Sequence, residues 1–230
     1  MEWDHISKFK TVVAKREGRH ALVTLARPSK SNALDDLMWA EIPQIFHALD
    51  QMDDVYAVVL TGQGKNFCAG IDIASLEADF VSPSANAKCP ARARERLLHK
   101  IKSSQNTISA IENCRWPVIA AVQGVASELA LTARVIKGEE ARQLGLVSQC
   151  FADETALLQH AHKTAELIAS KSPLAVVGTK RVLVHARDHS VPDGLDYVAA
   201  YNAAMLPSAD IQEVFKAVVK ERRAPNFSKL

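Results

Sequence analysis

The sequence VVLTGQGKNFCAGIDI, residues 58–73, carries the strongest local signal in the chain. It continues the apolar run Val55–Leu60, whose length and composition suit a strand buried on both faces of a parallel sheet. The glycine-containing turn Thr61–Lys65 then breaks the strand. At Ala69-Gly70-Ile71-Asp72 a new element begins, and its first N–H groups can face an oxyanion or a phosphate. From spacing alone, an ordinary tight turn is an equally good interpretation.

Strands and helices alternate on both sides of this stretch. Upstream, Thr11–Ala14 and Ala21–Leu25 form a predicted hairpin around Arg16-Glu17-Gly18. A helix should follow over Leu34–Leu49, where apolar residues recur every three or four positions, with a kink or restart at Pro43.

Downstream, a long helix over about 91–111 precedes a second buried strand, Val118–Val122. This order predicts an α/β fold with parallel strands joined by right-handed crossovers.

Beyond Gly124 the pattern becomes mainly helical. We expect helices over 127–135, 139–144 and 153–170, a short strand over 146–148, and mostly helix from Pro173 to about Arg223. The chain is therefore expected to divide into residues 1–126, an α/β part, and residues 127–230, a C-terminal helical region.

Composition excludes several classes of partner. With 28 basic and 26 acidic residues the net charge is only +2, which calls for neither nucleic acid nor a membrane surface. No apolar run approaches the ~20 residues that span a bilayer.

We also expect no metal site. The four cysteines form no CxxC pair. His160 and His162 stand two positions apart on a predicted helix, so their side chains should point in different directions. His185 and His189 are four positions apart and could share a ligand, but no carboxylate partner pattern in the sequence supports such a site.

The chain finishes in Ser228-Lys229-Leu230. A terminal Ser-Lys-Leu is read by the peroxisomal import receptor. The sequence thus predicts peroxisomal localisation, with that receptor as a partner.

Three blocks of sequence resemble the signature segments of the crotonase (enoyl-CoA hydratase/isomerase) family. They are Arg27-Pro28 with Asn32-Ala33-Leu34, the stretch 58–72, and Pro117–Gly124. Residues 187–191 and 195–206 are similar to the C-terminal helices of the dienoyl-CoA isomerases within that family, and the terminal Ser-Lys-Leu fits that group.

The resemblance implies a crotonase-like fold with a ββα superfolding core, and trimers or pairs of trimers. It also implies an acyl-CoA substrate with no separate cofactor, because coenzyme A is part of the substrate. The backbone N–H of Ile71 should be the first oxyanion donor. The segment that lines the thioester and pantetheine should be Ala69, Gly70, Ile71, Asp72 and Ile73.

One family segment has no counterpart in this sequence. Gly124-Val125-Ala126 runs at once into Ser127-Glu128-Leu129-Ala130, a motif that belongs well downstream in the family. The difference is roughly fifty residues, about one and a half βαβ units. The second oxyanion glycine and the catalytic Asp and Glu of the family lie there, so the sequence offers no catalytic acid or base.

Two other carboxylates are candidate substitutes, and neither is favoured. By resemblance, Glu128 falls on a structural helix position, and Asp72 has the character of a turn or capping residue.

The expected function is isomerisation of 3,5-dienoyl-CoA to 2,4-dienoyl-CoA in fatty-acid β-oxidation, with impaired catalysis. The 1,5-proton shift needs a base and an acid, and each of them typically raises the reaction rate by about 10²–10⁴-fold. Two alternatives remain open. One is a non-catalytic acyl-CoA-binding or hetero-oligomerising subunit, and the other is a non-functional product that quality control removes.

Overall fold

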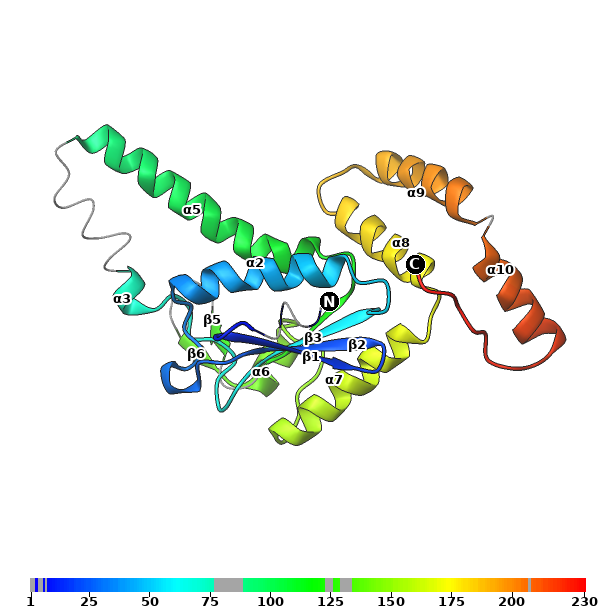
Figure 1. Ribbon diagram of the computed structural model, residues 1–230, viewed down its shortest axis with the longest axis horizontal. Coiled ribbons are helices and arrows are strands. Elements are labelled where there is room, and N and C mark those ends of the chain that lie inside the picture. Colours follow the sequence, from blue (N-terminus) through cyan, green and yellow to red (C-terminus); the bar gives the residue numbers. More distant parts are fainter. Residues whose placement is uncertain are drawn as a thin grey trace.

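A computed structural model describes residues 3, 6, 8–76, 89–122, 126–128, 134–206 and 208–230. Its centre is a four-stranded sheet in the order β1-β2-β3-β4 (Figure 1). The first strand runs antiparallel to the second, and the other three are mutually parallel. The predicted α/β arrangement with parallel pairing is thereby confirmed. The strands are β1 Val12–Glu17, β2 His20–Leu25, β3 Ala57–Gly62 and β4 Val118–Ala121.

The predicted hairpin forms, but its turn is shorter than expected. Arg16 and Glu17 extend β1 instead of lying in the turn, and Glu17 pairs with His20 at the end of the ladder. Only Gly18 and Arg19 turn the chain, and Gly18 adopts φ 63°, which glycine tolerates without steric cost.

Helices α2, Asp36–Asp50, and α5, Pro90–Asn113, lie together on one side of the sheet (Figure 1). Of the predicted kink or restart at Pro43, the restart is wrong, because α2 runs through this residue, and the kink stays a prediction. A helical proline leaves the carbonyl four residues earlier without its N–H donor. Here that carbonyl belongs to Trp39, and the Thr107 hydroxyl of α5 donates to it at 3.0 Å. A contact from another helix thus offsets part of the cost of the proline.

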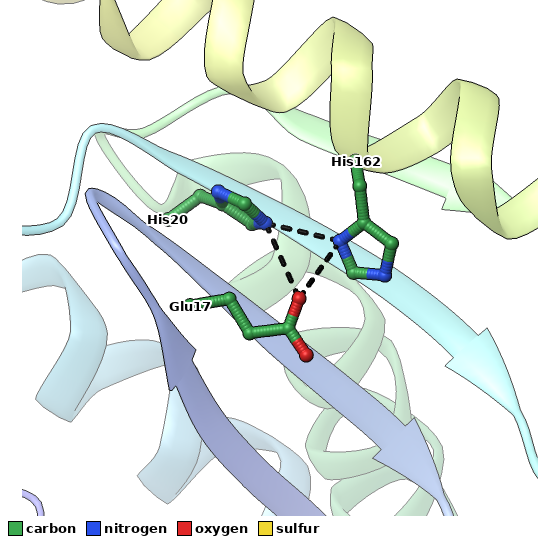
Figure 2. Close-up of side chains that lie close together, drawn as sticks. All are labelled: Glu17, His20 and His162. Carbon is green, nitrogen blue, oxygen red and sulfur yellow. Dashed lines mark hydrogen bonds and ion pairs between the residues drawn. The ribbon is translucent and has the colours of Figure 1, made fainter.

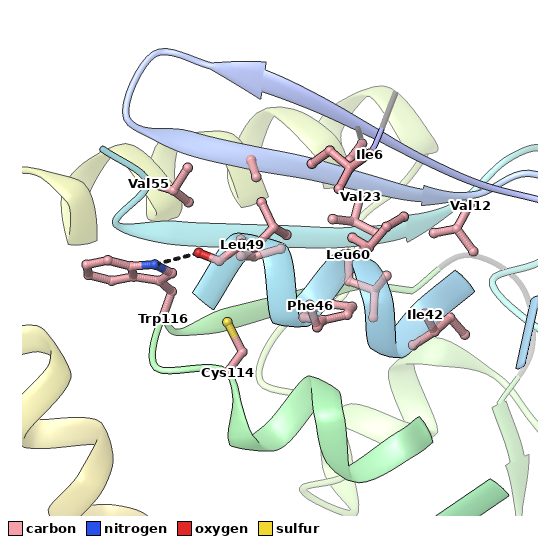
Figure 3. Close-up of a cluster of buried hydrophobic side chains, with 14 of the residues drawn as sticks. Ile6, Val12, Val23, Ile42, Phe46, Leu49, Val55, Leu60, Cys114 and Trp116 are labelled. Carbon is pink, nitrogen blue, oxygen red and sulfur yellow. Dashed lines mark hydrogen bonds between the residues drawn. The ribbon is translucent and has the colours of Figure 1, made fainter. Parts of the chain in front are cut away.

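The main core fills the space between this helix layer and the sheet (Figure 3). Alternate residues of β3, Val58 and Leu60, face α2 there. The Trp116 side chain is fully buried, and its indole N–H donates to the Leu49 carbonyl at 3.1 Å. This bond ties the entry to β4 to the end of α2.

Helix α7, Glu154–Ala169, covers the opposite face of the sheet (Figure 1). Ala161 and Ala165 pack there against Ala57 and Val59 of β3. The predicted helix over 153–170 is confirmed, with Asp153 as its N-cap accepting from the Ala156 N–H at 2.8 Å. A helix from the second half of the chain therefore completes the core of the first half, and the division at residue 126 stays a prediction.

The helix predicted over 127–135 is wrong in its described part. Ala126–Glu128 and Arg134–Ile136 form two short antiparallel strands, β5 and β6. Helix propensity is a weak preference that local pairing overrides. The strand predicted over 146–148 is also wrong, since these residues form turns and bends after helix α6, Gly138–Gln143.

The chain ends in helices that project away from the sheet (Figure 1). They are α8 Pro173–His185, α9 Val191–Met205, α10 Ala209–Val214 and a π-helical turn at Phe215–Lys220. Large apolar side chains on them remain exposed, among them Leu183, Leu195, Phe215 and Val219. No helix in the described residues has the length and apolar character needed to cross a membrane.

Candidate functional site

The predicted oxyanion turn lies beyond the carboxyl end of β3, against the segment that follows β2. The Leu34 N–H donates to the Gly70 carbonyl at 2.8 Å, and the Asp72 N–H donates to the Leu34 carbonyl at 3.0 Å. A third bond joins the Ala69 N–H to the Ser31 carbonyl at 3.0 Å. Gly70 adopts φ 91°, a conformation that favours glycine. These contacts fix the path of residues 69–72.

The backbone N–H of Ile71 is left available by this arrangement. Leu34 and Ile71 form a parallel bridge in which Leu34 takes both hydrogen bonds, so the N–H of Ile71 points away from it. Within the residues that the structure describes, this N–H has no recorded acceptor. The geometry is that of a free backbone donor on a held turn, as an oxyanion site requires.

Asp72 serves the turn as a capping residue, in agreement with its sequence interpretation. Its carboxylate accepts from the Ala74 N–H at 3.0 Å, at the start of the short helix α3, Ile73–Leu76. It also lies 3.1 Å from the Arg27 guanidinium. The Ala74 N–H and then Arg27 lower the pKa of Asp72. A carboxylate held in its ionised form by these partners is a poor proton donor at neutral pH.

The turn is open to solvent. Ile71 is 39% exposed and Ile73 is 80% exposed. A cavity of about 380 Å³ lies nearby at the carboxyl edge of β3 and β4, where Lys65, Val122 and Phe151 are among its lining residues. The predicted binding residues 69–73 do not line it.

The remaining sequence candidates are not joined to the turn. Gly124 and Val125 lie outside the described residues, and Glu128 is described only as backbone in β5. At the C-terminus, Ser228 and Lys229 are exposed, whereas Leu230 is half-buried against the core.

Sequence analysis missed a cluster of three ionisable side chains at the opposite, amino-terminal edge of the sheet (Figure 2). Glu17 and His20 flank the hairpin turn, and His162 comes from α7. His162 does diverge from His160, whose ring lies against Phe151 instead. All three residues are of types that bind metals, and this was the only signal in the sequence. Their proximity could not be predicted, because the two histidines are 142 positions apart in the chain.

Comparison with known proteins assigns the fold and the family. The family model for enoyl-CoA hydratase/isomerase matches residues 16–127 and 125–229, two segments that meet where the missing segment was predicted. Relatives include the proteins named Delta(3,5)-Delta(2,4)-dienoyl-CoA isomerase, peroxisomal, of Arabidopsis thaliana and its mitochondrial namesake of Homo sapiens. The first is 39% identical over 254 positions, covering 89% of this chain and 91% of the relative. The second is 34% identical, covering 92% and 80%.

The alignment lengths confirm the size of the gap. In the Arabidopsis comparison, 254 positions take in 89% of 230 residues, or about 205, so about 49 positions have no counterpart in this chain. This agrees with the roughly fifty residues predicted after Ala126.

Solved structures give the same fold. A putative enoyl-CoA hydratase from Streptomyces coelicolor superposes with a TM-score of 0.81 at 22% identity, covering 96% of this chain and 95% of that one. An enoyl-CoA hydratase from Bacillus anthracis gives 0.79 at 21% identity, covering 95% and 99%. The fold is crotonase-like, shortened internally, and the chain belongs to the enoyl-CoA hydratase/isomerase family of enzymes.

Proposed function

We propose that this chain is an acyl-CoA protein of the 3,5-dienoyl-CoA to 2,4-dienoyl-CoA isomerase type, from fatty-acid β-oxidation, whose own turnover is impaired. The observation that carries the proposal is the free N–H of Ile71 on a turn fixed by Leu34 and Gly70. Such a donor is suited to the thioester oxygen, where negative charge develops when a neighbouring proton is removed. The names of the relatives supply the substrate class.

Two features support impaired turnover. The carboxylate next to Ile71 in the chain, Asp72, is bound to the Ala74 N–H and to Arg27, and so is not a free acid or base. Preorganised donors also stabilise charge most strongly where water is excluded. The exposed side chains of Ile71 and Ile73 leave this turn wet.

Calorimetric titration with a medium-chain acyl-CoA, and with free coenzyme A for comparison, tests binding at the turn. Gly70→Ala forces a side chain into φ 91° and should move the Ile71 N–H, weakening acyl-CoA binding at least tenfold. Gly145→Ala is the matched control, because Gly145 also has a positive φ, 72°, and open space around its Cβ position. Equal affinity of the two variants would place acyl-CoA binding elsewhere.

A hetero-oligomerising subunit is the second candidate function. It is favoured by the exposed apolar surface of α9 and of the π-helical turn at Phe215–Lys220, where Leu195, Phe215 and Val219 are each more than half exposed. Patches of this kind mark interaction surfaces. Co-expression with a full-length family member and co-purification through a tag on one chain tests it, and separate elution of the two would contradict it.

For the compartment we propose the peroxisome. The Arabidopsis relative is named peroxisomal, and Ser228-Lys229-Leu230 matches the receptor-read address. The mammalian relatives are named mitochondrial. Fluorescence imaging therefore has to distinguish peroxisomes from mitochondria. An N-terminal fluorescent fusion should mark peroxisomes, and removal of the last three residues should disperse it. Mitochondrial fluorescence would contradict the proposal.

A further inference from the structure

The cluster of Glu17, His20 and His162 has the geometry of a metal-binding site. The His20 Nε2 atom lies 3.0 Å from His162 Nδ1. One Glu17 carboxylate oxygen lies 3.0 Å from His162 Nδ1 and 3.7 Å from His20 Nε2. Figure 2 shows the two ring nitrogens and the carboxylate oxygen facing one another across a small gap.

These separations suit a small divalent ion. Tetrahedral zinc holds His nitrogen and carboxylate oxygen at about 2.0–2.2 Å, which places neighbouring ligand atoms roughly 3.4 Å apart. A point about 2.1 Å from all three atoms exists roughly 0.9 Å out of their plane, close to the pyramidal position that three tetrahedral ligands define.

The surroundings also suit a cation. His20 is buried, with 4% of its side chain exposed, whereas 24% of the His162 and 41% of the Glu17 side chains are exposed, which leaves an entry path. A solvent-open cavity of about 520 Å³ adjoins the cluster and is lined by Glu17, His20 and Glu166. Among the described residues that line it, the cationic side chain is Arg19, and its guanidinium lies over the Tyr56 ring.

We propose that Glu17, His20 and His162 bind one zinc-class divalent ion, with water in the fourth position. A set of two histidines and one carboxylate is typical of zinc with an open position. The ion would join the β1–β2 hairpin to α7, and so link the sequence before residue 126 to the sequence after it. This site lies at the amino-terminal edge of the parallel strands and is separate from the Ile71 turn at their carboxyl edge.

The test is a calorimetric titration of the purified full chain with Zn²⁺ at neutral pH, followed by Co²⁺ absorption spectroscopy. We expect one saturable site, and a melting temperature that rises with Zn²⁺ concentration. The Co²⁺ spectrum should show visible bands of nitrogen and oxygen ligands without the intense near-ultraviolet band of thiolate. This readout separates the cluster from the four free cysteines, of which Cys68, Cys89 and Cys150 are at least partly exposed.

His162→Gln and Glu17→Gln should each weaken Zn²⁺ binding by more than the roughly 10–100-fold that loss of an outer-shell partner causes. His160→Gln, on the same helix but outside the cluster, is the control and should bind as the unmodified chain does. Circular dichroism establishes that each variant is folded. The absence of saturable binding, a thiolate spectrum, or equal binding by His162→Gln and His160→Gln would each overturn the proposal.

Discussion

At the scale of single residues, Glu41 is the buried charge that organises the first strand. Its carboxylate is 4% exposed and accepts from the N–H groups of Lys10, Thr11 and Val12 and from the Thr11 hydroxyl. Burial opposes ionisation, but these hydrogen bonds together outweigh it and lower the pKa of Glu41. The carboxylate thus joins α2 to the start of β1.

Glu41→Gln should therefore destabilise the chain by about 2 kcal/mol at neutral pH, since hydrogen bonds to charged groups each contribute about 1.5–3 kcal/mol. Because the folded-state pKa is lowered, the stabilisation is present above the pKa of the unfolded carboxyl and is lost as pH falls through the folded value. Urea unfolding at several pH values measures the free energy of unfolding of the variant and of the unmodified chain. The difference between the two should shrink in acid. Glu95→Gln, an exposed position on α5, serves as control. A difference that stays constant with pH would contradict this role.

Sequence predicts some of these residue roles and misses others. The roles of Asp72 as a cap and Gly70 as a turn residue follow from neighbours in the chain. The contacts of Glu41 with Thr11, and of His20 with His162, cross 30 and 142 positions. Nothing in local composition specifies such pairs, because they depend on how whole elements dock.

At the scale of elements, the contact between α2 and α5 carries the next prediction. Thr107→Val keeps the shape of the side chain but removes the hydroxyl that donates to the Trp39 carbonyl. The loss of stability should be about 1 kcal/mol, the low end of the cost of an unsatisfied acceptor, because this hydrogen bond is only partly buried. Thr107→Ser retains the hydroxyl, so its free energy of unfolding should fall by less than that of Thr107→Val.

A double-mutant cycle makes this test specific. In a Pro43→Ala background the N–H of residue 43 can donate to Trp39, so Thr107→Val should cost less there than in the unmodified chain. Chemical unfolding of the four proteins measures the coupling. Additive effects would show that the hydroxyl does not offset the proline.

The packing of α7 on the sheet carries a third prediction. Ala165 is fully buried against the sheet, so Ala165→Leu should overpack the contact and cost about 1–3 kcal/mol. Leu167→Ala is the control, because Leu167 is 58% exposed and its change should stay within about 0.5 kcal/mol. Thermal unfolding measures both. Equal midpoints would contradict close packing of α7.

Elements with a clear apolar period were predictable, and those around the junction were not. Helices α2, α5 and α7 follow their three- and four-residue spacing, and Val55–Leu60 correctly indicates a buried parallel strand. The stretch 127–135 has helix-forming composition, but its described residues lie in the strands β5 and β6. These strands pair with each other in a separate two-stranded sheet, and this pairing overrides the intrinsic preference.

At the scale of the whole molecule, a shorter internal region distinguishes this chain from its relatives. The family model stops and restarts at 125–127, and about 49 aligned positions have no counterpart. The sheet, its two helix layers and the Ile71 turn are nevertheless formed. The proposed function therefore keeps thioester binding at the Ile71 turn and lacks the proton transfer that an isomerase needs.

Turnover of a 3,5-dienoyl-CoA by the purified, folded chain tests this separation most directly. The conjugated 2,4-diene is followed by its ultraviolet absorbance, with the Arabidopsis relative as the positive reference. The proposed function gives this chain neither the acid nor the base, each of which contributes about 10²–10⁴-fold to the rate. The expected rate is therefore lower than that of the reference by at least about 10⁴-fold. Turnover comparable to that of the reference would contradict it, because residues of this chain would then supply the proton transfer.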